Sequence, residues 1–380
     1  METATIESRY EITGQPVRGV FFDAYPGRDW LQEQPVVIYS LREPRNLSLV
    51  EMQQVAAEAR RAQELTHLQI LAVRDVRLTD GRLLIVTENP RGQTLNQLLH
   101  REGPLPPERA VALVLQLCQA LQYAHEQGVL HGAMDTRSVF VGKQSDVLLG
   151  DFGTHGALGR TPCTAAYVRR QRVVFISPEE ARGRNPDKRS DVYALGVILY
   201  QMLCGRPPFQ DADPLAVARA HCDTPVSFPA ALRAAVPKPS QEITLTALAK
   251  DPEERYASVR ELRTELRNFA DRVFPKALVQ PAPPESPPPV PATELARKAA
   301  SSPTPAAAVV VEVPAKAPQV AAPASKRVTV QRTRPVRAVG DEDSLPSLLG
   351  AILPPNAVKS TLPKDSTVSQ KPEGEKSAST

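Results

Sequence analysis

The stretch FISPEEARGRNPDKRSDVYALGVILYQMLCGRPPF (residues 175–209) decides the fold of this 380-residue chain. Apolar residues recur through its second half at helical spacing, which predicts a helix over Asp191–Leu203. Gly205 and the two prolines that soon follow it end that helix, because glycine caps helices and proline cannot continue them. The stretch therefore belongs to a helical region, which we expect to span 93–272.

Upstream of this stretch, the sequence changes from helical to strand-rich patterns. The segment PPERAVALVLQLCQALQYAHEQG (106–128) predicts a second helix, with proline in its first turn and Gly128 after its end. Residues 8–92 contain the β-rich runs GVFFDAY, PVVIYSL and RLLIVTE around one helical stretch, Leu49–Leu65. Strands with one helix, followed by helices alone, indicate an α+β fold of two lobes, 8–92 and 93–272.

Downstream, the composition changes abruptly. Residues 276–380 contain no aromatic residue, histidine, cysteine or methionine, and they hold 18 of the 38 prolines. We expect 275–380 to form a disordered Pro/Ala-rich tail, because such a segment cannot bury enough apolar surface to fold. The tail carries 13 Lys and Arg against nine Asp and Glu, an excess that equals the net charge of +4. The folded part is therefore neutral and gives no electrostatic reason to expect a nucleic-acid partner.

Two tail segments stand apart from the rest. KRVTVQRTRPVR (326–337) is basic, and DEDSLPSLLGAILPP (341–355) places leucines and an isoleucine at helical spacing after an acidic start. The second segment is either a solvated linker or a short helix, over 344–353, that folds into a groove of a partner.

The sequence also bears on location. No run approaches the ~18 apolar residues of a membrane helix, and the first residues lack the pattern of a secretory signal. The four cysteines are scattered without close pairs, which favours a reducing compartment and argues against a zinc site. We therefore expect a cytoplasmic protein with no membrane span.

Several motifs in order along the chain carry a resemblance. LGDFG (149–153), HEQGVLHG (125–132), the stretch at 175–209 and DPEERYASVRELRTEL (251–266) resemble the bacterial eukaryotic-like serine/threonine protein kinases over about residues 10–268. The resemblance implies a bilobal kinase-like domain, 8–272, with a small β-rich N-lobe and a helical C-lobe. It also implies structural roles: Glu179 pairs with Arg255, Asp191 accepts backbone donors beneath the catalytic loop, His131 stacks on Phe152, and Glu58 is the glutamate of the N-lobe helix.

The groups that transfer phosphate in this family are replaced. The catalytic loop reads HGAMDTRSVF (131–140), so Ala133 stands at the position of the catalytic aspartate and Ser138 at that of the metal-binding asparagine. Gly132 replaces the arginine that senses activation-loop phosphate. Asp135 stands at the loop lysine and is the candidate surrogate base. QRVVF (171–175) lacks the threonine that steadies the loop.

The lysine that clamps the phosphates is also missing. PVVIYSL (35–41) places Tyr39 at that position, and the first lysine of the chain is Lys143. Arg18 is the available cationic surrogate. We hypothesise that the Tyr39 hydroxyl donates to Glu58; in the alternative, Glu58 turns out to water.

The nucleotide and metal positions are partly kept. In GQPVRGVF (14–21) proline stands at the second glycine and has no N–H to offer a phosphate. Either the cleft is closed by Phe21, Val37 and Tyr39, or it still takes ATP. Asp151 of the DFG motif either holds Mg²⁺ or persists to end a strand. The nucleotide-binding positions implied by the family are Gly14, Gly19, Phe21, Val37, Thr87, Glu88 and Asn89.

Three hypotheses about function follow. The first is a pseudokinase, a scaffold or regulator that contacts an active kinase or its substrates through the C-lobe or the tail. The second is a serine/threonine kinase of weak or unconventional activity, with Asp135 as its base. In the third, the fold is only a tether and the tail carries the function.

Overall fold

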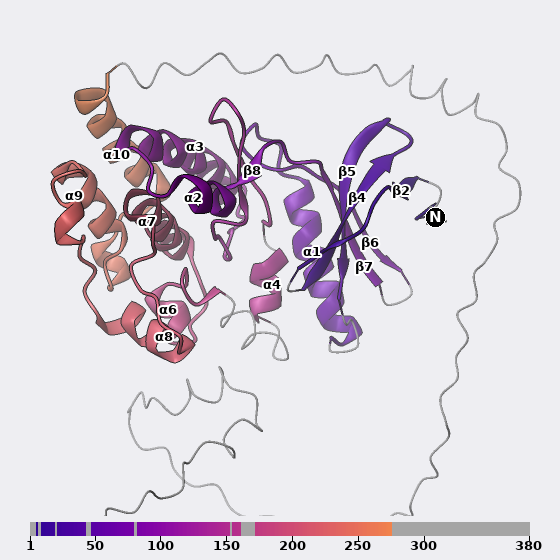
Figure 1. The fold of residues 1–380 in the computed structure, drawn as a ribbon. Coiled ribbons are helices and arrows are strands. Elements are labelled where there is room, and N and C mark those ends of the chain that lie inside the picture. The colour runs from indigo at the N-terminus through magenta and orange to yellow at the C-terminus, as the bar shows by residue number, and fades with distance from the viewer. Residues whose placement is uncertain are drawn as a thin grey trace, which may run out of the picture.

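The computed structural model describes residues 5–6, 9–19, 21–42, 47–79, 82–152, 154–160 and 172–275. They form a small β-rich lobe and a larger helical lobe (Figure 1). This confirms the expected two-lobed α+β fold of the kinase type. The tail predicted from residue 275 onward, including its short helix at 344–353, lies outside the described residues except for Pro275.

The small lobe is built on an antiparallel sheet of order β1-β2-β4-β5-β7-β6, with β3 paired to β4. In β5, Tyr39 lies opposite Ala24 of β4 and Ile85 of β7, so its side chain shares a face with those two residues. The strands are β1 Thr5–Ile6, β2 Tyr10–Ile12, β3 Val17–Arg18, β4 Phe22–Asp29, β5 Gln34–Leu41, β6 Val73–Thr79 and β7 Arg82–Glu88.

The helix of the small lobe, α1 (Leu49–Gln63), begins where the sequence predicts it and ends two residues early. Ser48 and Glu51 form a reciprocal capping box at its start, which satisfies backbone N–H groups that the first turn leaves open. Its buried residues are Met52, Val55, Ala56, Ala59 and Ala62. Most of them are small, so the helix can lie close to the sheet.

The large lobe is mostly helical and carries a second, three-stranded sheet of order β10-β9-β8. Its strands are β8 Gln93–Thr94, β9 Val139–Val141 and β10 Val147–Leu149. The helices are α2 Leu95–Glu102, α3 Pro107–Glu126, α4 Thr154–Arg160, α6 Pro178–Ala181, α7 Lys188–Cys204, α8 Pro214–Asp223, α9 Lys238–Ala247 and α10 Val259–Val273, with 3₁₀ turns at Ala230–Leu232 and Pro252–Glu254.

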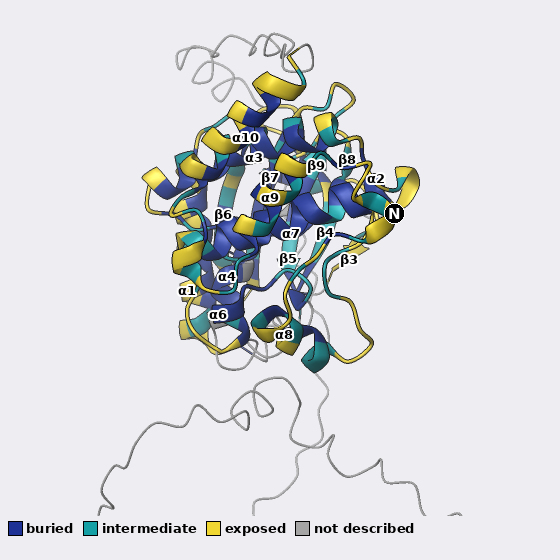
Figure 2. Cartoon of the chain, turned by 90° about the vertical axis from the view of Figure 1, so that its left-hand side faces the viewer, coloured by how far each residue is buried: buried dark blue, intermediate teal, exposed yellow. Residues whose placement is uncertain are grey.

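Helix α7 is the centre of the large lobe, and nearly every residue from Ser190 onward is buried (Figure 2). It begins three residues before the predicted Asp191, because the Asp187 side chain accepts from the N–H groups of Arg189 and Ser190. It ends as predicted at Gly205, whose φ of 72° is the left-handed conformation that glycine adopts without strain.

A short helix that the sequence did not predict lies directly after the DFG motif. Helix α4 starts two residues after Phe152 and contacts α1. Ala157 and Leu158 are buried in the same apolar cluster as Val55 and Ala56 of α1. Helix α4 therefore packs into the small-lobe core and contributes to the position of α1 (Figure 1).

Candidate active site

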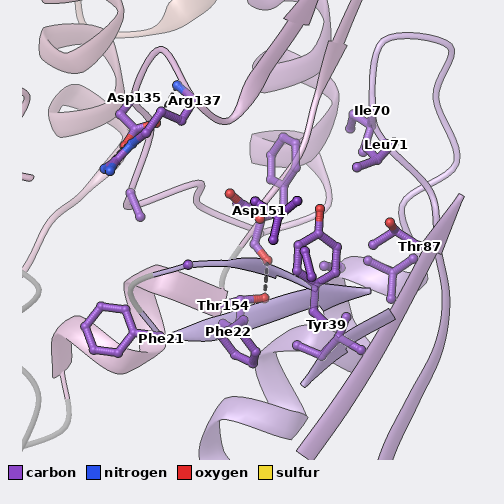
Figure 3. Close-up of a pocket in the computed structure, with 18 of the residues that line it drawn as sticks. Phe21, Phe22, Tyr39, Ile70, Leu71, Thr87, Asp135, Arg137, Asp151 and Thr154 are labelled. Carbon is purple, nitrogen blue, oxygen red and sulfur yellow. Dashed lines mark hydrogen bonds and ion pairs between the residues drawn. The ribbon is translucent and has the colours of Figure 1, made fainter. Parts of the chain in front are cut away.

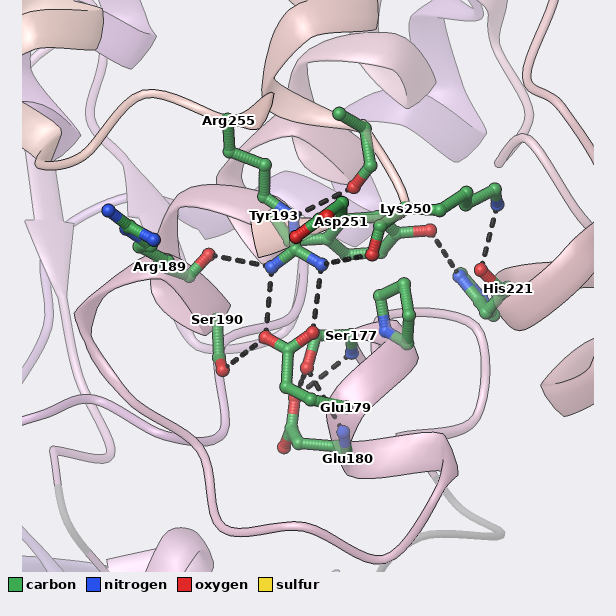
Figure 4. Close-up of polar contacts among 12 residues, drawn as sticks. Ser177, Glu179, Glu180, Arg189, Ser190, Tyr193, His221, Lys250, Asp251 and Arg255 are labelled. Carbon is green, nitrogen blue, oxygen red and sulfur yellow. Dashed lines mark hydrogen bonds and ion pairs between the residues drawn. The ribbon is translucent and has the colours of Figure 1, made fainter. Parts of the chain in front are cut away.

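The ion pair between Glu179 and Arg255 ties the start of α6 to the segment before α10. The guanidinium donates to both carboxylate oxygens, at 2.9 and 2.8 Å, and Ser190 donates to the same carboxylate at 2.6 Å (Figure 4). Burial raises the pKa of Glu179, but the hydrogen bonds and charge of Arg255, together with the bond from Ser190, lower it below its usual value. The pairing predicted from the sequence is confirmed.

Asp191 holds the catalytic loop from below, as expected. Its carboxylate accepts from the backbone N–H groups of His131 at 3.0 Å and Gly132 at 2.9 Å, and it lies 2.8 Å from His125 Nε2. Burial raises its pKa, yet the bonds from His125 and Gly132 prevail and lower it. His131 packs on Phe152 with ring centroids 4.7 Å apart, which confirms the predicted stack.

The catalytic loop, which the structure describes throughout, offers no free carboxylate. Ala133 is buried at the position of the family's aspartate. The Asp135 carboxylate accepts from Arg137 Nε at 2.9 Å and from its terminal nitrogen at 2.5 Å. It also accepts from the backbone N–H of Ser138 at 3.1 Å. Burial raises the pKa of Asp135. The charge and hydrogen bonds of Arg137, with the charge of Arg172, lower this pKa by more than burial raises it, so the carboxylate is a poor proton acceptor.

Arg172 is a residue of this site that the sequence analysis missed. Its side chain is buried against the catalytic loop and donates to the carbonyls of Gly132 at 3.2 Å and Met134 at 3.4 Å. Among the described residues, its Nε has no hydrogen-bond partner. The only sign of this role in the sequence is the single cation next to the apolar residues of QRVVF (171–175). Our sequence analysis considered that segment only for its missing threonine.

Tyr39 and Asp151 face the same cavity from opposite lobes (Figure 3). Burial raises the pKa of Tyr39, the charge of Asp151 raises it further, and the neighbouring Thr87 side chain acts in the opposite direction. Glu58, which is partly exposed, lies 3.6 Å from Arg61 on the next turn of α1. The carboxylate that acts on the Tyr39 hydroxyl is therefore that of Asp151, and not that of Glu58, which we expected.

The cleft retains a cavity of about 220 Å³. Of the predicted nucleotide positions, Gly19, Phe21 and Thr87 line this cavity, so the cleft is not filled as one alternative proposed. The structure also describes the other predicted nucleotide positions, but they do not line the cavity: Gly14, Val37, Glu88 and Asn89. The surrogate cation Arg18 does not line it either.

The hinge, residues 87–89 between the two lobes, is a poor site for a purine ring. The N–H of Glu88 already donates to the Ala72 carbonyl at 3.0 Å. Pro90, two residues on, has no N–H. The resemblance, which implied Thr87, Glu88 and Asn89 as nucleotide-binding positions, takes no account of this proline.

Of the two metal-binding positions that the resemblance implies, Ser138 is used within the loop and Asp151 keeps a carboxylate in the cavity lining. The Ser138 hydroxyl donates to the Asp135 carbonyl at 2.8 Å and accepts from the Asp135 N–H at 3.2 Å, so both of its hydrogen-bonding roles are used. No group of three or more His, Cys, Asp or Glu side chains that could bind a metal occurs within the described residues. Asp151 keeps a left-handed backbone, with φ of 61°, but among the described lining residues it is the only carboxylate outside the pair with Arg137.

The two lobes, the Glu179–Arg255 pair and the loop above Asp191 define a protein of the kinase class. Residues 17–266 match the family model of the protein kinase domain, and the chain belongs to this family. No helix in the described part of the chain is long and apolar enough to cross a membrane.

Relatives of the chain are named as bacterial kinases. It is 33% identical over 280 residues to serine/threonine-protein kinase PknB of Mycolicibacterium smegmatis, covering 72% of this chain and 44% of that protein. It is 31% identical over 259 residues to probable serine/threonine-protein kinase PknB of Lactococcus lactis, covering 68% and 41%. The chain thus spans less than half the length of these relatives. The crystal structure of a mutant of the Mycobacterium tuberculosis PknI kinase domain shares the fold, with a TM-score of 0.56, 22% identity, and coverage of 71% of this chain and 99% of that one.

Proposed function

We propose that this chain is a pseudokinase, a regulatory or scaffold protein that acts through protein contacts and transfers little or no phosphate. The observation that carries the proposal is the ion pair of Asp135 with Arg137, two residues after Ala133 in the catalytic loop. With alanine at the base position and its nearest carboxylate held in an ion pair, no described loop group is free to orient an acceptor hydroxyl.

Three other features support the same proposal. Tyr39 replaces the phosphate-binding lysine, and burial keeps its phenol neutral, so it offers no positive charge. The hydroxyl of Ser138 is used within the loop. The side chain of Arg172 fills the space beside the loop carbonyls, where an acceptor peptide would need to approach. Each lost transition-state contact costs roughly 10²–10⁴-fold in rate.

The second candidate is a serine/threonine kinase of weak activity. The observation in its favour is the name of the relatives, which are serine/threonine kinases. Because positioning and charge stabilisation dominate phosphoryl transfer, loss of the base alone does not abolish it.

We expect the full chain to give no phosphate transfer from radiolabelled ATP, with Mg²⁺ or with Mn²⁺, to itself or to a generic protein substrate. An active bacterial serine/threonine kinase assayed in parallel is the positive control. Asp135→Asn should leave the background unchanged. Transfer that Asp135→Asn abolishes would establish the second candidate and refute the pseudokinase.

The partners are also proposed. An active kinase or its substrates would bind through the C-lobe or the tail, in the cytoplasm; the unpaired Cys118, Cys204 and Cys222 agree with a reducing compartment. Affinity purification of the full chain, compared with the chain ended after residue 274, separates the two surfaces. Partners that depend wholly on the tail would favour the hypothesis that the fold is a tether.

A further inference from the structure

Helix α1 presents an exposed face to solvent along its length. Its buried residues lie on the side that packs against β6 and α4. A helix has about 3.6 residues per turn, so a second set of positions shares the opposite side. From Leu49 to Arg60 this side is about 17 Å long, at a rise of about 1.5 Å per residue. The structure leaves the side chains of this outward face exposed: Leu49, Val50, Gln53, Ala57, Arg60 and Arg61.

The two ends of the outward face differ in chemistry. At its start, Leu49 is 56% and Val50 61% exposed. At its end, Arg60 and Arg61 are exposed, and within the described residues Arg60 forms no ion pair. Arg61 lies 3.6 Å from Glu58, which is on the flank of the helix. The face therefore changes from apolar to basic along the chain, and covering its apolar end would be favourable.

The tail contains one segment with a complementary order. DEDSLPSLLGAILPP (341–355), which lies outside the described residues, begins with three acidic residues and continues with apolar ones. Ser344 is a preferred N-cap residue, proline is tolerated in the first turn, and acidic residues favour the N-terminal end of a helix. The prolines at 354 and 355 end such a helix at residue 353. Over 344–353 the apolar residues share one side of a helix: Leu345, Leu348, Leu349 and Ile352.

An antiparallel alignment matches these two surfaces. It places the apolar side of 344–353 beside Leu49 and Val50, and the acidic start of the segment beside Arg60. The lengths agree, because a helix over 344–353 is about 14 Å long and the acidic residues before it extend to the basic end of α1. A parallel alignment would place the acidic residues beside Leu49 and leave the arginines against leucine. Charge of this kind sets orientation more than affinity.

The segment can reach α1 within one chain. The described chain ends at Pro275, after α10 of the large lobe, and α1 belongs to the small lobe (Figure 1). Asp341 comes 66 positions after Pro275. A flexible linker of that length has a root-mean-square span of about 45 Å, which is about the width of a folded domain of this size. Such a tether gives an effective concentration on the order of millimolar, so a weak helix contact is populated.

We propose that residues 341–353 form a short helix that binds antiparallel along the outward face of α1 in the same chain. The proposal goes beyond the pseudokinase function and does not depend on it, because it involves the tail and α1 alone. While the segment is bound, it covers the apolar start of α1 and is withheld from other proteins. A partner that captures the segment uncovers α1.

Hydrogen exchange of the full chain, followed by mass spectrometry, tests the contact. We expect the amides of 345–353 to exchange about tenfold more slowly, relative to their intrinsic rates, than amides elsewhere in the tail. Two single changes should each remove this protection: Val50→Glu on α1 and Leu348→Glu in the segment. Leu31→Glu, at an exposed apolar position on the hairpin between β4 and β5, and Leu362→Glu, elsewhere in the tail, are the matched controls and should keep it.

Charge reversal tests the orientation. Arg60→Glu should lower the protection of the segment about threefold, as expected for loss of an exposed pair. Adding Asp341→Lys and Asp343→Lys to Arg60→Glu should restore it, because the reversed charges again attract. Asp341→Lys and Asp343→Lys without Arg60→Glu should lower the protection. Failure of the combined variant to regain protection would refute the antiparallel alignment.

Photocross-linking identifies the surface and the chain that supplies the segment. A benzophenone amino acid in place of Gln53 should cross-link to 341–353 within a single chain. An absence of protection in 345–353 would overturn the proposal, as would protection that persists in Val50→Glu. Cross-links between two chains, with protection lost on dilution, would assign the segment to a second copy and also overturn it. Leu348→Glu lies outside the described fold, so it gives a result even if Val50→Glu does not fold.

The outcomes for the two proposals can be told apart. Phosphate transfer by the chain would refute the pseudokinase, whatever the exchange of 345–353 shows. An unprotected segment, with transfer still absent, would refute the contact between tail and α1 and leave the pseudokinase intact.

Discussion

Replacing Arg255 by leucine is expected to lower the free energy of unfolding by about 3–5 kcal/mol. The substitution leaves the Glu179 carboxylate buried without its cation and removes donors from the carbonyls of Ala249, Arg189 and Lys250. Urea unfolding followed by circular dichroism measures the loss. Arg267→Leu, which removes an exposed i,i+4 pair with Asp271, is the matched control and should cost only about 0.3 kcal/mol.

The acid dependence of the same variant gives a second measurement. In the wild type the pKa of Glu179 lies below its usual 4.5, so its contribution is present above about pH 4.5 and is lost as the pH falls through the lowered pKa. Without Arg255, burial raises that pKa, so protonation of Glu179 stabilises the variant as the pH falls. The stability difference between the two should therefore shrink from about pH 7 to about pH 4.5. Parallel curves would contradict this account.

Replacing Asp191 by alanine is the second change with a large expected effect, also a loss of about 3–5 kcal/mol. It leaves two backbone N–H groups of the catalytic loop and the His125 ring without their acceptor, and each buried group costs about 1–3 kcal/mol when unpaired. Hydrogen exchange at the amides of His131 and Gly132 should quicken in step. Unfolding measured in urea gives the free energy.

Asp191→Asn is the control for that experiment. The amide oxygen still accepts one or two of the three bonds, so the loss of stability should be smaller and the loop amides should keep part of their protection. A loss below about 1 kcal/mol for Asp191→Ala would mean that the loop is held by other contacts.

Pairs within the family's spaced motifs could be predicted from the sequence. Three predictions of this kind were confirmed: the pair of Glu179 with Arg255, the acceptor role of Asp191, and the stack of His131 on Phe152. Each depends on motifs whose order along the chain fixes the two lobes. Helix α7 was predicted within three residues at its start, because its cap at Asp187 lies outside the apolar pattern that marks the helix.

The parts of the site that the sequence did not predict depend on long-range approach. Arg172 donates to carbonyls that lie 38 and 40 residues away in the sequence. Helix α4 is stabilised by the packing of Ala157 and Leu158 against the apolar face of α1. The ion pair of Asp135 with Arg137 is short-range, because the two residues are two positions apart. Whether Asp135 forms this pair or stays available as a base depends on its burial in the folded chain. Periodicity carries no information on any of these contacts.

The phenol at position 39 has a consequence for how such a chain would be detected in a cell. None of the described residues that line the cleft is a lysine, so reagents that deliver an acyl group from a nucleotide phosphate to a nearby amine have nothing there to label. A proteome surveyed with such reagents would leave this chain uncounted, however abundant it was. An inventory of kinase-fold proteins built on amine capture therefore selects for chains that keep a lysine in the cleft and omits this one.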